Sequence, residues 1–215
     1  MARRRRQKIQ SKRNRSNLTH KSRMQTNTKI HSGRDSGTYI TQGMRFLYDD
    51  KLELAIEYFE KAIIANPEDA RSYSCIGAAL EHLGRPGEAI NHFKRAIKLD
   101  SQNADLHAEM GAVFWDLGKH RDVIDCFNRA VELNPTNLSV RSSMGMALFM
   151  SGRHKEAIAA YDDIIRMDPQ NSDAYYGKAI ILSQLERYSE ASECFEKMIK
   201  IDPKNVEKLG QMIAS

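Results

Sequence analysis

The residues best suited to metal or acid–base chemistry in this 215-residue chain are its histidines and cysteines, and their spacing argues against both uses. His120 and His154 are 34 residues apart, at equivalent places of a repeating pattern, whereas the ligands of one metal ion must lie within a few ångströms of each other. Cys75, Cys126 and Cys194 show neither metal-ligand spacing nor a disulfide framework, so we expect free thiols in a reducing compartment. The sequence contains no nucleophile elbow, phosphate loop or HExxH motif. We therefore expect surface histidines, no cofactor, no metal site, no small-molecule substrate and no catalytic activity.

A second chemistry, the binding of anions, is concentrated in the first 35 residues. Residues 1–35 contain twelve Lys or Arg and one acid, which gives them a net charge of +11. The other 21 Lys or Arg and 27 Asp or Glu of the chain give residues 36–215 a net charge of −6. We interpret residues 1–35 as a disordered basic arm, because a segment with so few apolar residues cannot offset its ordering entropy. The alternatives are a short helix that folds only on a partner and a true start at Met24, which would remove ten of the twelve cations. The anion-binding candidates are the cations nearest the N-terminus: Arg3, Arg4, Arg5, Arg6, Lys8, Lys12, Arg13 and Arg15.

The rest of the chain repeats every 34 residues. The clearest series is aromatic and consists of Phe59, Phe93, Phe127, Tyr161 and Phe195. Four of the five prolines also share one register, namely Pro67, Pro135, Pro169 and Pro203. Within each unit, apolar residues recur at steps of three and four, which predicts two amphipathic helices, and a Gly such as Gly84 often separates them. A fixed period of this length indicates a helical repeat array.

These positions give the chain a specific resemblance to the tetratricopeptide repeat family, whose pattern is an aromatic, then Leu-Gly, an aromatic, Ala, Phe, Ala and Pro. The resemblance implies an all-α, right-handed α-solenoid of five helix pairs, with a short C-terminal capping helix at 206–215. The expected repeats within the array 36–215 are 36–69, 70–103, 104–137, 138–171 and 172–205. The pattern's first Trp is absent from every copy, and Asp50 and Glu186 replace the turn Gly. These departures weaken single joints and leave the register intact.

The resemblance also implies a concave groove lined by the first helix of each repeat. Mapped onto that wall, the sequence predicts an apolar floor with acidic flanks and with Trp115 as an anchor for a bound segment. Packing between adjacent first helices is the alternative for the apolar series that includes Met44, and also for Trp115 and Phe149 one turn further along. The candidate groove residues are Met44, Leu47, Arg71, Glu81, Asp105, Glu109, Trp115, Asp116, Met146, Phe149, Asp173 and Ile180.

One groove type of this family is disfavoured. Members that hold the C-terminal carboxylate of heat-shock chaperones use Lys, Arg and Asn on their first helices. The matching positions here carry apolar, small or acidic side chains such as Met44, Asp105 and Glu109, which cannot pair with a carboxylate.

We therefore expect a non-enzymatic scaffold that binds a peptide or partner segment in its concave groove. Such a scaffold could also assemble with copies of itself, which would make the protein a homo-oligomer. In length and repeat count the chain resembles the small five-repeat protein that coats magnetosome membranes. The alternative is an adaptor that associates with nucleic acid, the ribosome or an anionic membrane through the basic arm. No apolar stretch follows the arm, so we expect no secretory signal and a cytoplasmic protein, with attachment to a membrane or organelle surface as an extension of that location.

Overall fold

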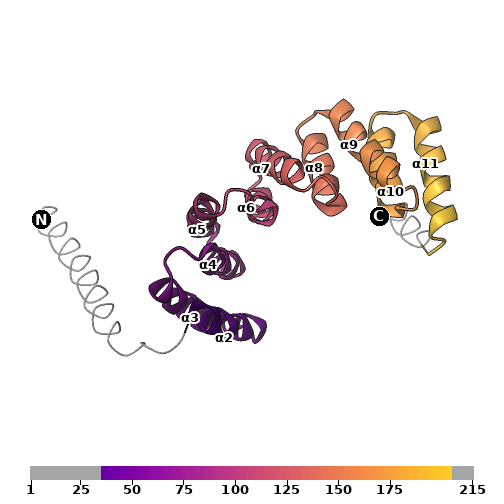
Figure 1. Ribbon diagram of the computed structural model, residues 1–215. Coiled ribbons are helices and arrows are strands. Elements are labelled where there is room, and N and C mark those ends of the chain that lie inside the picture. The colour runs from indigo at the N-terminus through magenta and orange to yellow at the C-terminus, as the bar shows by residue number, and fades with distance from the viewer. Residues whose placement is uncertain (1–34, 205–215) are drawn as a thin grey trace, which may run out of the picture.

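The computed structural model describes residues 35–204, and within them it contains ten α-helices and no strand (Figure 1). The helices are α2 (Ser36–Tyr48), α3 (Leu52–Ala65), α4 (Ala70–His82), α5 (Pro86–Leu99), α6 (Ala104–Asp116), α7 (His120–Leu133), α8 (Leu138–Met150), α9 (His154–Met167), α10 (Ser172–Gln184) and α11 (Tyr188–Ile201). They form five successive pairs, so the predicted all-α solenoid of five helix pairs is confirmed. The predicted basic arm, apart from Asp35, and the predicted capping helix at 206–215 lie outside the described residues.

Every first helix begins at a side-chain cap. The residue before each of these helices is Asp or Asn, and its side-chain oxygen accepts a hydrogen bond from a backbone N–H of the first turn. Such a cap satisfies one of the donors that a helix start leaves unpaired, and it stabilises the helix by about 1 kcal/mol. The five capping residues are Asp35, Asp69, Asn103, Asn137 and Asn171. The 34-residue period therefore recurs in the structure as a helix start at each of these points.

The turn between the two helices of each pair needs one residue in the left-handed conformation. That residue is glycine in three repeats, as predicted, and its φ lies between 66° and 75°. Asp50 and Glu186 take the same place with φ of 57° and 59°. A side chain there costs on the order of 1 kcal/mol, because its Cβ crowds the following carbonyl. These two turns keep the geometry of the other three at a cost in stability.

Within each pair, a small residue on the first helix lets an aromatic ring of the second helix approach the backbone. A Cβ added at Gly77 of α4 would lie 2.8 Å from the ring of Phe93 on α5, and one added at Gly111 of α6 would lie 2.7 Å from the ring of Phe127 on α7. Real Cβ atoms do not approach other atoms so closely, so any larger residue at these positions would force the helices apart. The rings of this series in the first four repeats are buried, and they lie in the main hydrophobic core.

In three repeats, the side chain at the position of the pattern's first Trp contacts the preceding inter-repeat loop. Tyr73 donates its hydroxyl to the Pro67 carbonyl at 3.2 Å, and Arg141 donates Nη2 to the Pro135 carbonyl at 3.0 Å. His107 Nε2 lies 3.4 Å from the carbonyl of Ser101. Each side chain thus reaches the loop carbonyl six residues earlier, and three different residue types tie the inter-repeat loop to the helix that follows it.

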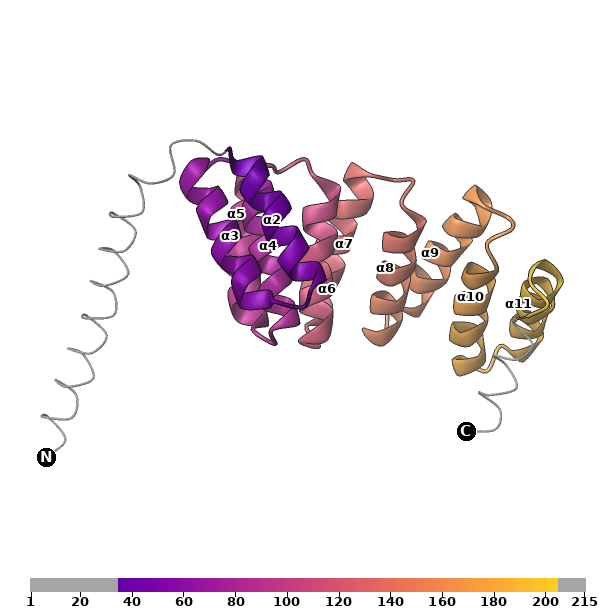
Figure 2. The same cartoon turned by 90° about the horizontal axis from the view of Figure 1, so that it is seen from below.

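The pairs follow one another along a curved array, with the first and last pairs at opposite ends (Figures 1 and 2). First helices of neighbouring repeats pack directly on each other at α2–α4, α4–α6 and α8–α10. Each second helix also packs on the first helix of the next repeat. Within residues 35–204, no helix is both long enough and apolar enough to cross a bilayer.

Replacing Gly177 with alanine should lower the free energy of unfolding by about 1–3 kcal/mol. The ring of Tyr161 is buried between two glycines, and a Cβ at Gly177 of the next repeat would lie 2.5 Å from its Cζ atom. The ring cannot withdraw freely, because its hydroxyl donates a 3.3 Å hydrogen bond to the carbonyl of Ser142. Urea unfolding measures the change. The matched control is Gly87→Ala, where a Cβ meets no atom within 4 Å and the helical site should gain about 0.5–1 kcal/mol. Equal stability of the two variants would contradict the packing at Tyr161.

Candidate functional site

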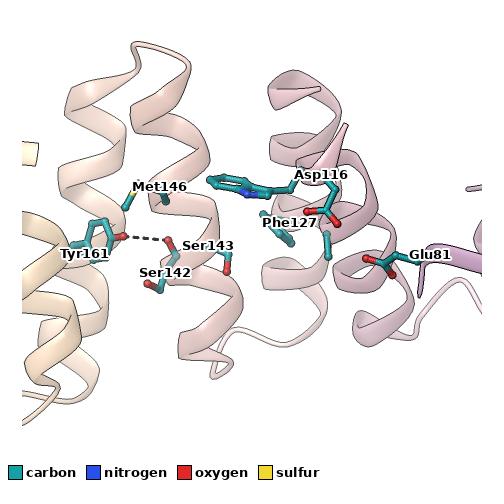
Figure 3. A pocket seen from close by; sticks show the side chains of 9 residues that line it. Glu81, Asp116, Phe127, Ser142, Ser143, Met146 and Tyr161 are labelled. Carbon is teal, nitrogen blue, oxygen red and sulfur yellow. Dashed lines mark hydrogen bonds between the residues drawn. The ribbon is translucent and has the colours of Figure 1, made fainter. Parts of the chain in front are cut away.

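A pocket opens on the side of the array formed by first helices, at the junction of α6 and α8. Its volume is about 420 Å³. Glu81 comes from α4, and the small side chains Ala112, Ser142 and Ser143 leave the space that larger residues would fill. Figure 3 shows Glu81 and Asp116 on one side of the pocket, with Met146 and Tyr161 on the other. The complete lining is Glu81, Ala112, Trp115, Asp116, Phe127, Ser142, Ser143, Met146 and Tyr161.

The floor of the pocket is apolar. Phe127 of α7 and Tyr161 of α9 are core aromatics of the second helices, and each presents part of its ring to the pocket. The indole of Trp115 and the thioether of Met146 are half-buried at its sides. A cavity of this size with aromatic walls and a few convergent polar groups is typical of a ligand-binding site.

The rim of the pocket is acidic. Glu81 of α4 and Asp116 of α6 line the pocket, and Asp105 and Glu109 lie further along α6; none of the four forms a salt bridge with a residue of the described range 35–204. Burial raises the pKa of Glu81 above its ordinary value, and the charges of Asp116 and Glu109 raise it further.

The pKa of Glu109 is also raised, although much of its side chain remains accessible to solvent. Protein packed around its carboxyl group raises its pKa, the Asp105 charge adds to the increase, and a 2.7 Å hydrogen bond from the Ser74 hydroxyl opposes it. Raised carboxyl pKa values mean that this surface holds its negative charge at a free-energy cost. A bound cation would lower that cost.

Two adjacent repeats carry the same aromatic–histidine pair. Trp115 and His120 meet edge to face with ring centroids 6.2 Å apart, and the equivalent Phe149 and His154 are 5.4 Å apart. The prediction that both histidines lie on the surface is wrong, because they are half-buried and each Nδ1 atom is enclosed, with no hydrogen-bond partner among residues 35–204. The reason is local: each histidine is the first residue of a second helix, and its ring lies against the aromatic one residue before the end of the first helix.

The predicted groove residues divide into two groups. The structure brings Glu81, Trp115, Asp116 and Met146 together at the pocket. The remaining candidates lie elsewhere along the first helices: Met44, Leu47, Arg71, Asp105, Glu109, Phe149, Asp173 and Ile180.

Several of the latter have other structural partners. Leu47 and Phe149, like Trp115, are half-buried against the main core. Met44 is 46% exposed, and its sulfur lies 3.8 Å from Sγ of Cys75. Arg71 makes a two-pronged ion pair with the helix cap Asp69, with contacts of 3.0 and 2.8 Å, so its charge does not offset the acids of the pocket.

Sequence reasoning missed some pocket residues. The sequence places Phe127 and Tyr161 in the repeating aromatic series and not among the candidate groove residues, which also do not include Ser142. The run of small side chains at Ala112, Ser142 and Ser143 is the signal that could have indicated an opening between α6 and α8.

The thiols and metal-binding side chains of residues 35–204 suggest no second site. All three cysteines are free, and burial raises the pKa of the Cys75 and Cys126 thiols to about 11, which keeps them protonated and unreactive at neutral pH. Among these residues, no three His, Cys, Asp or Glu side chains are grouped as a metal ion would require.

The helix-pair period agrees with comparisons to known families. Tetratricopeptide repeat profiles match residues 58–91, 109–172 and 148–214, and a profile described as a TPR repeat matches residues 82–118. Together these matches span residues 58–214 without a gap. The chain belongs to the tetratricopeptide repeat family. This repeat protein is a non-catalytic scaffold for protein interactions.

Solved structures have the same fold. A crystal structure of MamA is 23% identical, covers 77% of this chain and 96% of its own, and has a TM-score of 0.70. YrrB, described as a TPR protein with an unusual peptide-binding site, is 26% identical, with 87% and 96% covered and a TM-score of 0.71. MamA from Desulfovibrio magneticus RS-1 is 19% identical, with 80% and 97% covered and a TM-score of 0.72. A comparison with curated proteins finds no match.

Proposed function

We propose that this repeat protein binds an extended segment of a partner protein in the groove over α4, α6 and α8. One apolar side chain of that segment enters the pocket beside Trp115 and Met146. An adjacent Arg or Lys lies against Glu81 and Asp116. The observation that carries the proposal is the pocket itself, a cavity of about 420 Å³ with an aromatic floor and with the carboxylates of Glu81 and Asp116, which form no salt bridge within residues 35–204, at its rim.

The apolar half of the pocket supports a side-chain anchor. Burying a Leu or Ile side chain stabilises a complex by about 1.5–3 kcal/mol, and an aromatic wall provides rigid contact area at low entropic cost. The hydroxyls of Ser142 and Ser143 can bond to the backbone of a bound segment. The description of YrrB as a peptide-binding TPR protein supports the same class of ligand.

The charged half of the pocket supports a basic residue next to the anchor. A guanidinium can bond to carboxylates while its flat face stacks on an indole, and Trp115 lies beside Asp116 in the pocket lining. The raised pKa of Glu81 favours the same ligand, because a neighbouring cation removes part of the repulsion from Asp116 and Glu109. A segment that ends in a free carboxylate would be repelled.

The test is a titration with a capped peptide in which one leucine stands between two arginines. Trp115 is the only tryptophan of the chain, so its fluorescence reports events in the pocket directly. The double variant Glu81→Gln, Asp116→Asn should weaken binding by about 1–2 kcal/mol, or roughly five- to thirtyfold, because each partly exposed ion pair contributes up to about 1 kcal/mol. A peptide with glutamates in place of the arginines should bind neither protein.

The matched control is Glu193→Gln, Glu196→Gln on α11, which removes the same charge from exposed positions of a second helix. It should leave the affinity unchanged. In the unaltered protein the affinity should also fall as the pH is lowered through the raised pKa values of Glu81 and Glu109, since protonation removes the charge that a cation pairs with. Equal binding of the arginine and glutamate peptides would refute the proposed site.

A further inference from the structure

We propose that, in the free protein, the pocket is occupied by the chain's own residues 3–15, docked within the same molecule. This inference rests on the proposed function, because it requires the groove to accept a basic segment with an apolar residue. It goes further by naming the occupant. The groove would then bind an external partner only when that partner displaces the arm.

Charge complementarity is the first argument. Residues 1–34 carry twelve Lys or Arg and no acid, and eight of these cations fall within residues 3–15. The groove has the opposite sign, since α6 alone carries Asp105, Glu109 and Asp116 and no Lys or Arg. Glu81 of α4 adds a fourth carboxylate without an ion pair in the described residues. Two surfaces of opposite sign within about 8 Å attract each other with little screening at physiological salt.

The chemistry of the segment matches both halves of the pocket. Residues 3–15 read RRRRQKIQSKRNR, so the apolar Ile9 stands between two groups of cations. Ile9 suits the apolar floor at Met146 and Phe127. Six of the eight flanking cations are arginines, whose guanidinium groups can bond to carboxylates and stack on an indole such as Trp115. The cations outside this segment, Lys21 to Arg34, have no comparable apolar neighbour between two such groups.

The arm is long enough to reach the pocket. Its attachment point, Asp35, caps the start of α2, whereas Trp115 lies at the end of α6, two repeats away. A helix of thirteen residues is about 20 Å long, and two steps between packed first helices add about 20 Å sideways, so the direct separation is about 30 Å. Residues 16–34 would span about 25 Å on average as a flexible chain and about 60 Å when extended. The linker therefore matches the separation that gives a tethered segment its highest effective concentration.

That effective concentration makes a weak contact sufficient. A short flexible tether gives on the order of 1 mM, so a segment with a Kd of about 0.1 mM would be docked about ten times as often as free. An external peptide must compete with this docked state. Removing the charge of the arm should therefore raise the affinity for an external peptide about tenfold.

The experiment uses the full-length protein and the fluorescence of Trp115, quenched with acrylamide, which carries no charge. In the unaltered protein, Trp115 should be protected at low salt and exposed at high salt. A variant with all eight cations of residues 3–15 replaced by Gln should be exposed under both conditions and should bind the free peptide RRRRQKIQSKRNR about tenfold more tightly than the unaltered protein does. The matched control replaces Lys21, Arg23, Lys29 and Arg34 by Gln, and it should retain the protection.

The outcomes separate this proposal from the proposed function. If the eight-residue variant and the unaltered protein have equally exposed Trp115 and bind the peptide equally, the arm proposal is wrong and the groove function stands. If neither protein binds a basic peptide, the groove function is wrong as well. If the protection of Trp115 from acrylamide increases with protein concentration and the protein also sediments faster, the arm docks into a neighbouring copy, and docking within one molecule is wrong. Protection independent of concentration supports the proposal.

Discussion

Replacing Phe127 with alanine should lower the free energy of unfolding by about 3–5 kcal/mol. The ring is 5% exposed and packs in the main core beneath Gly111, in the central repeat. Its removal forfeits the transfer free energy of the aromatic group and leaves a cavity that the glycine opposite cannot fill. Because the ring also borders the pocket, water can enter part of that cavity, so the loss should lie toward the lower end of the range.

The aromatic residues at the equivalent position of other repeats serve as controls, because they differ in how deeply they are buried. Phe93 is fully buried, and its replacement by alanine should cost at least as much as that of Phe127. Phe195 is only half-buried in the last repeat, and its replacement should cost clearly less. The midpoints of urea unfolding curves, followed by far-ultraviolet circular dichroism, give this order directly. If replacing Phe195 lowered the free energy of unfolding more than replacing Phe93 or Phe127, the aromatic series would not form the core of the array.

The 34-residue period in the sequence was sufficient to predict the helix pairs. The residues that recur with this period have the same structural role in every repeat. An aromatic such as Phe93 recurs because each repeat buries one ring against a small residue of its partner helix. The turn residues recur because each turn needs the left-handed conformation, even where Asp50 and Glu186 occupy it. These requirements are the same in every copy, so five copies made them visible.

The position of the pocket could not be predicted, because it depends on a difference between copies. Small side chains at Ala112, Ser142 and Ser143 can either let two helices close together or leave a space, and only the packing of the whole junction decides which occurs. The ion pair between Arg71 and Asp69 is a different case. It is local to a helix cap and could have been inferred from the spacing of the two residues.

Replacing Trp115 with alanine should weaken binding of the leucine–arginine peptide by about 2 kcal/mol or more, roughly thirtyfold. The indole is the largest side chain in the pocket lining, which also includes the rings of the apolar floor and the carboxylate of Asp116. It can therefore contact both the apolar anchor and the flat face of an arginine. Calorimetry is the appropriate measurement, because the variant contains no other tryptophan to report on binding.

The chain provides a close control in Phe149→Ala. Phe149 has the same place in the next repeat, is half-buried against the same core and meets His154 as Trp115 meets His120. It is not part of the pocket lining. Both variants lose a half-buried aromatic contact, so both should be less stable, but only Trp115→Ala should lose affinity. If Phe149→Ala weakens the peptide as much as Trp115→Ala does, the loss arises from loosening of the array, and the pocket is not the binding site.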